Sequence, residues 1–202
     1  MSQGPHSHLA HVPSGRSRRW DAPGVADLEW DGTRLWAEAR AKVVRLRARS
    51  RNTGLGFAVQ LDTSILMAIH LRRERPVYVF VRYIQSSGGT VLVSPWAWRE
   101  FLGMRSAPLP AGEQAIRRRL LQRLRIVVVD PAIERSGRFA WGVRLLRAAW
   151  PQARRTQDVL VAATAFAGGH SVVTQDAGFL GQRLVDVILL PRRPSNGARR
   201  PR

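Results

Sequence analysis

Four acidic residues stand at the ends of short apolar runs, where carboxylates could hold a metal ion. Asp62 and Asp176 follow runs rich in Val or Leu, Glu100 lies a few residues after another such run, and Asp158 begins an apolar stretch. In an open α/β sheet, side chains beyond the carboxyl ends of separate strands can converge on one crevice. Converged carboxylates repel one another, and a bound divalent cation offsets that repulsion. The four acids therefore predict a metal site.

Each acid also has a purely structural explanation. Asp62, together with Thr63 and Ser64, could cap the first helix of the domain, and Glu100 could lie on a helix surface beside a neighbouring arginine. Asp158 could be a first-turn acid favoured by the helix dipole, and Asp176 could form an Asx-turn in a loop. These explanations are plausible one at a time, but together they leave the shared strand-end position of the four acids unexplained.

The charge of the chain points to a polyanionic partner. The 202 residues include 33 Lys and Arg against 14 Asp and Glu, a formal charge of +19, and every basic residue except Lys42 is arginine. Guanidinium binds phosphate through a planar fork, so nucleic acid is the first candidate, although a general bias toward arginine could explain part of the pattern. Arg154 and Arg155 precede Asp158 and could guide an RNA backbone.

Composition excludes several classes of protein. The chain has no cysteine, which rules out disulfides, zinc-thiolate sites and thiol nucleophiles. Its longest apolar stretch is about half of what a membrane span needs, and its first twenty residues lack a signal-peptide core. We therefore expect a soluble, cytoplasmic protein that makes no membrane contact.

The ends of the chain are expected to lie outside the folded domain. Residues 1–56 form a basic leader, disordered over 1–24, that could contain a helix at 33–49 followed by a linker at 50–56, and residues 191–202 form a basic, disordered tail. A helix at 33–49 would put Leu35, Ala39, Val43 and Leu46 on one face. We expect the leader to be dispensable for folding, because it has little core surface to bury. It is either an RNA-steering arm or lies upstream of the true start, for which Leu55 and Val59 are candidates.

Between these ends, residues 57–190 alternate between β-branched runs and helical patterns, which is typical of a parallel sheet flanked by helices. The fold class is α/β, with a three-layer α/β/α domain and a mainly parallel sheet of about five strands. Pro76–Ile84 favours a strand by propensity, but topology makes it a helix. Asp130 and Ser94 each precede a proline and should cap helices. Strands are expected at 57–61, 90–94, 126–130, 171–174 and 186–190, and helices at 64–73, 76–87, 95–105, 112–124, 132–149 and 156–168.

The motifs resemble those of the PIN-domain ribonucleases, and most closely the VapC-type toxins of type II toxin–antitoxin systems. The resemblance covers residues 57–190 and rests on the sequences around the four acids: Leu61-Asp62-Thr63-Ser64, a Glu in the helix after the second strand, Asp158 followed by Ala162-Ala163-Thr164-Ala165, and Thr174-Gln175-Asp176-Ala177-Gly178-Phe179. Two features depart from the family. Gly178 stands where many relatives carry a second acid, and the basic leader lies outside the usual domain.

The resemblance implies a metal-dependent endoribonuclease. Mg²⁺ or Mn²⁺ would be the cofactor, because hard cations prefer carboxylate and water oxygens. It carries over Asp62, Glu100, Asp158 and Asp176 as catalytic metal ligands, with Asp62 and Asp158 the direct ligands that we favour. The hydroxyls of Thr63, Ser64 and Thr174 would support the site. It also implies an antitoxin partner and a homodimer.

Two alternatives remain open. An RNase H-like nuclease would use similar ligands but would begin with several antiparallel strands before a crossover. A non-catalytic PIN-like domain would bind RNA through its arginines with a weak or lost metal site. Metal titration would separate this last reading from the two enzymatic ones.

Overall fold

The computed structural model describes residues 34–103, 108–151, 153 and 156–192. Their centre is a five-stranded sheet in the order β3-β2-β1-β4-β5, and every neighbouring pair of strands is parallel. The expected α/β class and parallel sheet are therefore confirmed. The antiparallel opening of an RNase H-like nuclease is absent from the described residues. The strands are β1 (Phe57–Leu61), β2 (Gly89–Val93), β3 (Val127–Val128), β4 (Ser171–Thr174) and β5 (Val187–Leu189).

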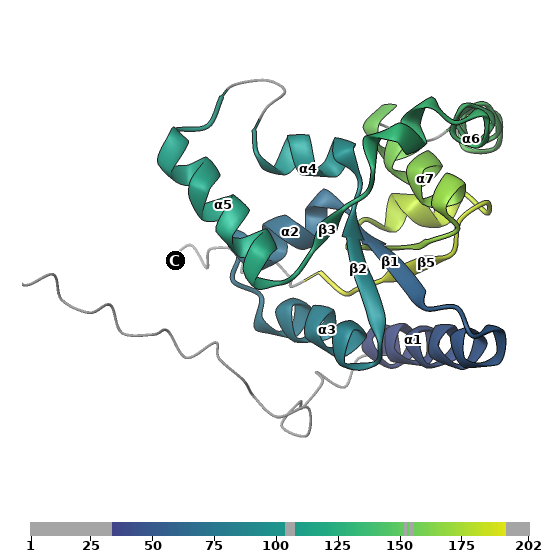
Figure 1. The fold of residues 1–202 in the computed structure, drawn as a ribbon, viewed down its shortest axis with the longest axis horizontal. Helices are drawn as coiled ribbons and strands as arrows, with labels where there is room; N and C mark the ends of the chain where they lie inside the picture. Colours follow the sequence, from purple (N-terminus) through teal and green to yellow (C-terminus); the bar gives the residue numbers. More distant parts are fainter. Residues whose placement is uncertain (1–33, 104–107, 152, 154–155, 193–202) are drawn as a thin grey trace, which may run out of the picture.

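Helices cover both faces of the sheet and complete the three layers. Figure 1 shows α1 and α3 on one side, with α6 and α7 on the other. Strand β4 is buried along its whole length, as expected for a strand covered on both faces. The helices are α1 (Arg34–Thr53), α2 (Thr63–His70), α3 (Arg75–Ser86), α4 (Pro95–Phe101), α5 (Ala111–Arg123), α6 (Gly137–Ala149) and α7 (Thr156–Gly168), with short 3₁₀ helices η2 (Pro131–Arg135) and η3 (Ala177–Gly181).

Helix α3 confirms the choice of a helix over a strand. Its side chains Val77, Phe80, Val81 and Ile84 are all buried, and this spacing of three and four residues places them on one helical face. Pro76 stands in the first turn, where its missing N–H costs no hydrogen bond. Helical periodicity and a parallel-sheet connection thus override the β propensity of the run.

Helix α1 packs on the domain, and this corrects the expectation that the leader buries little core surface. Trp36, Ala39 and Val43 are at most 3% exposed and belong to the same core cluster as the sheet. Lys42 Nζ lies 3.0 Å from Asp186 Oδ1 and also donates to the carbonyl of Val187 in strand β5. The expected linker is also wrong in part, because residues 50–53 continue the helix to Thr53.

Two capping predictions are confirmed, and one of the expected helices is found as two separate helices. Asp130 Oδ1 accepts a hydrogen bond from the Ala132 N–H at 2.8 Å, and Ser94 Oγ accepts one from Ala97 at 3.1 Å. The helix expected over 132–149 is instead η2 followed by α6. Ser136 separates them, because its Oγ caps α6 by accepting from the Phe139 N–H at 3.1 Å.

The expected disorder of residues 1–24 and of the tail from residue 193 lies outside the described residues. None of the described helices is long and apolar enough to cross a membrane.

Candidate functional site

The candidate site lies where three adjacent strands end. Strand β1 has β2 and β4 as its neighbours, and its last residue, Leu61, pairs with Val93 of β2 and Val173 of β4. Asp62 therefore leaves the sheet at the same edge as the segments that follow β2 and β4. This is the carboxyl edge at which open α/β sheets bind their ligands.

Asp62 is the most buried of the four predicted acids. It is 7% exposed, and its Oδ2 accepts hydrogen bonds from Ser64 Oγ at 2.7 Å and from Thr174 Oγ1 at 2.9 Å. The same oxygen accepts a longer bond, 3.4 Å, from the Ser64 N–H as the cap of α2. The capping explanation is therefore correct, but it is incomplete because Thr174 belongs to another strand.

Burial raises the pKa of Asp62 above its ordinary value of 3.8. The hydrogen bonds from Ser64 and Thr174 act in the opposite direction, because they favour the ionised form, but desolvation is the larger effect. An unpaired carboxylate here is unfavourable near neutral pH, and a cation beside it would reverse that preference.

Thr174 connects Asp62 to the loop that carries Asp176. Thr174 is fully buried, and its Oγ1 accepts a hydrogen bond from the Asp176 N–H at 2.9 Å while donating to Asp62. The Asp176 side chain is exposed, and its Oδ1 accepts from the Gly178 N–H at 2.8 Å. Asp176 thus makes the expected Asx-type turn. It also lies only two residues after Thr174, which donates a hydrogen bond to Asp62.

Glu100 accepts hydrogen bonds from the sequence neighbours of Asp62 and Asp158. Its Oε2 accepts a hydrogen bond from Thr63 Oγ1 at 2.5 Å and another from Gln157 Nε2. Thr63 follows Asp62, and Gln157 precedes Asp158, which is partly buried in the first turn of α7. Glu100 is therefore turned toward the site and not toward solvent on a helix surface.

The convergence of all four acids on one point stays a prediction. Across the described ranges, no three His, Asp or Glu side chains lie close enough together to form a metal-binding group. The donor chemistry still fits a hard divalent cation, because carboxylates and hydroxyls meet at one edge and Asp62 is held there without a cationic partner among its hydrogen bonds. Arg154 and Arg155 lie outside the described residues.

Sequence reasoning missed two glutamines that organise the site. Gln157 holds Glu100, and Gln175 is 8% exposed and donates its backbone N–H to Ser64 Oγ at 3.1 Å. Only their position in the sequence could have indicated that they belong to the site, since Gln157 adjoins Asp158 and Gln175 lies between Thr174 and Asp176.

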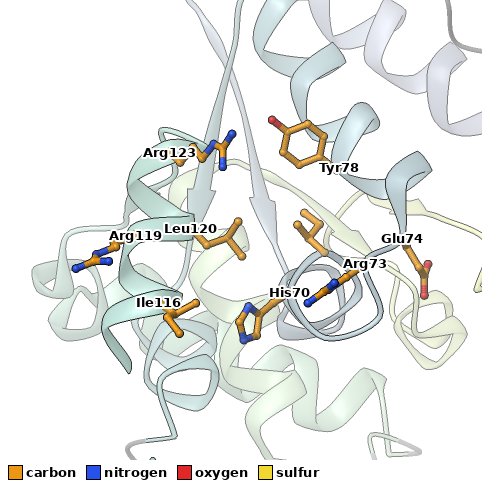
Figure 2. Close-up of a pocket in the computed structure, with 9 residues that line it drawn as sticks. His70, Arg73, Glu74, Tyr78, Ile116, Arg119, Leu120 and Arg123 are labelled. Carbon is orange, nitrogen blue, oxygen red and sulfur yellow. The ribbon is translucent and has the colours of Figure 1, made fainter. Parts of the chain in front are cut away.

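A separate pocket of about 430 Å³ lies between α2, α3 and α5. Figure 2 shows Leu120 and Ile116 along one wall, with Arg119 and Arg123 on the same helix. Helices α2 and α5 are joined beside it, because His70 Nε2 lies 2.7 Å from Glu113 Oε1. The lining residues are Ile69, His70, Arg73, Glu74, Tyr78, Ile116, Arg119, Leu120 and Arg123.

Residues 59–181 match the family model of the PIN domain. The chain belongs to the PIN-domain family. The matched range contains all four predicted acids, whereas α1 precedes it. Comparison of this PIN domain with curated proteins gives no match.

A solved structure shares the fold of this PIN domain. VapBC2 from Rickettsia felis, bound to a DNA fragment from the promoter, is similar with a TM-score of 0.55 and 18% identity, over 65% of this chain and 97% of that chain. VapBC-1 from nontypeable Haemophilus influenzae has a TM-score of 0.48 and 19% identity, over 65% of this chain and 96% of that chain. At 18% identity the likeness to VapBC2 concerns the fold alone.

Proposed function

We propose that this PIN domain is an endoribonuclease that uses Mg²⁺ or Mn²⁺ and is the toxin of a toxin–antitoxin pair. The observation that carries the proposal is Asp62, a buried aspartate with a raised pKa at the end of the central strand. Perturbed carboxyls in such a crevice are functional-site candidates. Membership of the PIN-domain family supports the same assignment.

Asp62 and Asp158 would be direct ligands of the ion, and Glu100 and Asp176 would complete the set. When bound, a divalent cation would polarise the scissile phosphodiester and activate the attacking water. Ser64 and Thr174 orient Asp62 by donating to Oδ2, so that its other oxygen keeps a defined direction. Thr63 and Gln157 orient Glu100 in the same way.

The RNA substrate is supported by charge. A formal charge of +19, almost all from arginine, favours a phosphate-rich partner and would accelerate its binding at low salt. We propose that Arg154 and Arg155 contact the RNA backbone, because they precede Asp158 by only four and three residues in the sequence. These contacts would position RNA without reading its sequence.

The antitoxin and the homodimer are part of the same proposal. The motifs around the four acids resemble those of VapC-type toxins, and this chain shares the fold of the Rickettsia felis VapBC2 structure. The pocket between α2, α3 and α5 has apolar walls and arginines at its rim, which suits a segment carrying apolar and acidic side chains. Arg119→Glu should weaken neutralisation by the antitoxin. Arg118→Glu, on the same helix outside the pocket lining, should not.

Cleavage of RNA by the purified full chain tests the proposed activity. We expect cleavage in Mn²⁺, none in EDTA, and loss of cleavage in Asp62→Ala and Asp158→Ala with the fold intact. Asp130→Asn is the control, because Asp130 also caps a helix after a strand but is exposed. Equal cleavage in EDTA, or a wild-type rate in either alanine variant, would contradict the proposal. RNA binding without cleavage or Mn²⁺ binding would favour the non-catalytic alternative.

A further inference from the structure

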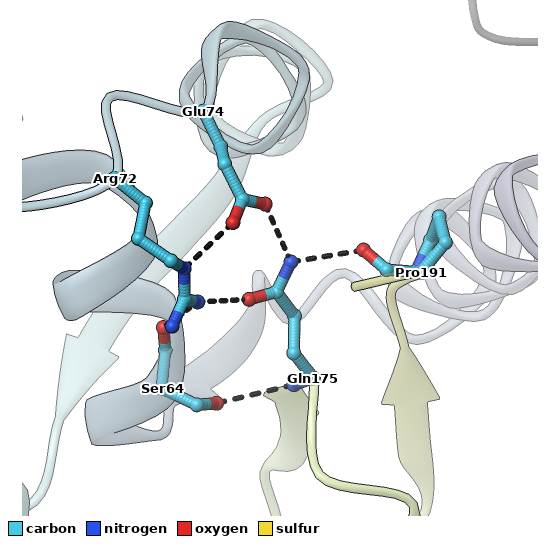
Figure 3. Close-up of polar contacts among 5 residues, drawn as sticks. All are labelled: Ser64, Arg72, Glu74, Gln175 and Pro191. Atoms are coloured by element: carbon cyan, nitrogen blue, oxygen red, sulfur yellow. Dashed lines mark hydrogen bonds and ion pairs between the residues drawn. The ribbon is translucent and has the colours of Figure 1, made fainter. Parts of the chain in front are cut away.

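Arg72, Glu74 and Gln175 form a closed hydrogen-bonded cluster beside the site (Figure 3). Arg72 Nε donates to Glu74 Oε1 at 2.6 Å, and Gln175 Nε2 donates to Glu74 Oε2 at 2.8 Å. The third side of the triangle is a hydrogen bond from an Arg72 guanidinium nitrogen to Gln175 Oε1. Each of the three side chains therefore contacts the other two.

The cluster holds backbone from four parts of the chain. Arg72 donates to the Ser64 carbonyl at 3.2 Å, and Gln175 Nε2 donates to the Pro191 carbonyl at 2.9 Å. The Gln175 backbone N–H donates to Ser64 Oγ, the same hydroxyl that donates to Asp62. The start of α2, the turn before α3 and the segment after β5 are thus all bonded to Gln175 in the loop after β4.

Stability alone does not account for this cluster. The Glu74 side chain is 5% exposed, and although Glu74 stands at the N-cap of α3 its side chain makes no capping bond. The Arg72 side chain is 36% exposed, and an ion pair that solvent reaches on one side adds little to stability. Between Arg72 and Glu74, Arg73 has a φ of 49°, a conformation that costs energy and is kept only where the surroundings impose it.

We propose that Arg72, Glu74 and Gln175 are positioning residues for the carboxylate site. Through Ser64 they fix the hydroxyl that orients Asp62, and through the Gln175 backbone they fix the loop that carries Asp176. They touch neither substrate nor ion. The proposal rests on the proposed nuclease function for its kinetic effect, but its structural effect belongs to the metal-free protein.

Gln175→Met tests the proposal, with Gln182→Met as the matched control. Met keeps the length of glutamine and removes its polar atoms. Gln182 is 3% exposed and bonds only the nearby backbone of Leu184 and Val185 in the described structure. In Gln175→Met we expect kcat to fall about 10–100-fold, as for other residues that orient metal ligands, with KM for RNA unchanged. Gln182→Met should keep the wild-type kcat.

Amide hydrogen exchange of the metal-free variants separates positioning from general destabilisation. The N–H groups of residues 175 and 176 should exchange faster in Gln175→Met, because their acceptors on Ser64 and Thr174 lose their fixed places, and at the wild-type rate in Gln182→Met. A triple variant with Arg72→Met, Glu74→Leu and Gln175→Met controls for misfolding of the single variant, because it removes all three polar side chains of the cluster. It should melt near the wild-type temperature, because the partly exposed Arg72–Glu74 pair adds little to stability, and it should still show the reduced kcat.

Three outcomes would decide the matter. Wild-type kcat and wild-type exchange at residues 175 and 176 in Gln175→Met, or a wild-type kcat in the folded triple variant, would overturn the positioning role. So would equal losses of kcat in Gln175→Met and Gln182→Met. If the wild-type chain cleaves no RNA, the proposed function fails, and the exchange rates alone still test the positioning role.

Discussion

Helix α1 and the carboxyl edge of the sheet both bury side chains, but of opposite chemistry. Helix α1 buries Trp36, Ala39 and Val43, which are apolar, whereas the edge buries Asp62 and Thr174, which are polar. Burial of apolar surface stabilises a fold by about 25 cal/mol per Å². Burial of a carboxylate without a cation destabilises it. Helix α1 therefore stabilises the folded state. The buried carboxylate at the edge lowers the free energy of unfolding but places Asp62 in a fixed position.

The difference between these regions teaches that stability and activity should be separable in this protein. Variants of α1 should unfold the chain without changing the chemistry of the molecules that stay folded. Variants of the edge should change the chemistry and leave the fold as stable or make it more stable.

The largest effect should come from removing α1. A shortened chain beginning at Gly54 loses Trp36, Ala39 and Val43 from the core and the Lys42 contacts to strand β5. We expect it to be insoluble or to lack a cooperative thermal transition by circular dichroism. A chain beginning at Arg34 is the control and should melt like the full chain. A cooperative transition near the full-length melting temperature for the Gly54 chain would show that α1 adds nothing to stability.

A single substitution within α1 should have a smaller effect of the same kind. Trp36 is 3% exposed, and its ring centroid lies 5.9 Å from that of Phe80 in α3. Trp36→Ala should lower the free energy of unfolding by about 3–5 kcal/mol, measured by urea denaturation. Trp141→Ala is the control, because Trp141 is 51% exposed. Reduced RNA cleavage per folded molecule in Trp36→Ala would contradict the view that α1 affects stability alone. An equal loss of stability in Trp36→Ala and Trp141→Ala would contradict the role of Trp36 in the core.

The smallest effect should appear at the edge and have the opposite sign. Because the folded-state pKa of Asp62 is raised, the folded protein holds this proton more tightly than the unfolded chain. The contribution of Asp62 to stability is therefore full below its ordinary pKa of 3.8 and is lost as pH rises through the folded value. Asp62→Asn should melt higher than the metal-free wild type near neutral pH. This difference should shrink toward acid pH, and a difference that is independent of pH would contradict the assignment.

The parallel sheet and the strand-end position of Asp62 could be predicted from sequence, because both follow from local patterns. Runs of β-branched residues located β1 and β4, and Asp62 marked the start of α2 as its cap. Helix α3 needed topology as well, since its β-branched residues favour a strand taken alone.

The rest depended on contacts between distant residues. The packing of α1 was missed because its arginines dominate its composition, although the face of Ala39 and Val43 had been noted. The cluster around Gln175 was missed because its partners Arg72 and Glu74 lie about a hundred residues earlier in the chain. A single sequence contains no pattern that identifies contacts between residues so far apart.

Binding of Mn²⁺ to the metal-free full chain, measured by isothermal titration calorimetry, tests the central claim most directly. We expect the wild type and Asp130→Asn to bind Mn²⁺ equally, because Asp130 caps η2 on the surface. Asp62→Asn should bind Mn²⁺ much more weakly, because it removes a charged ligand from the edge while keeping the shape of the side chain. Equal Mn²⁺ affinity in all three proteins, or no binding by the wild type, would contradict a metal site at Asp62.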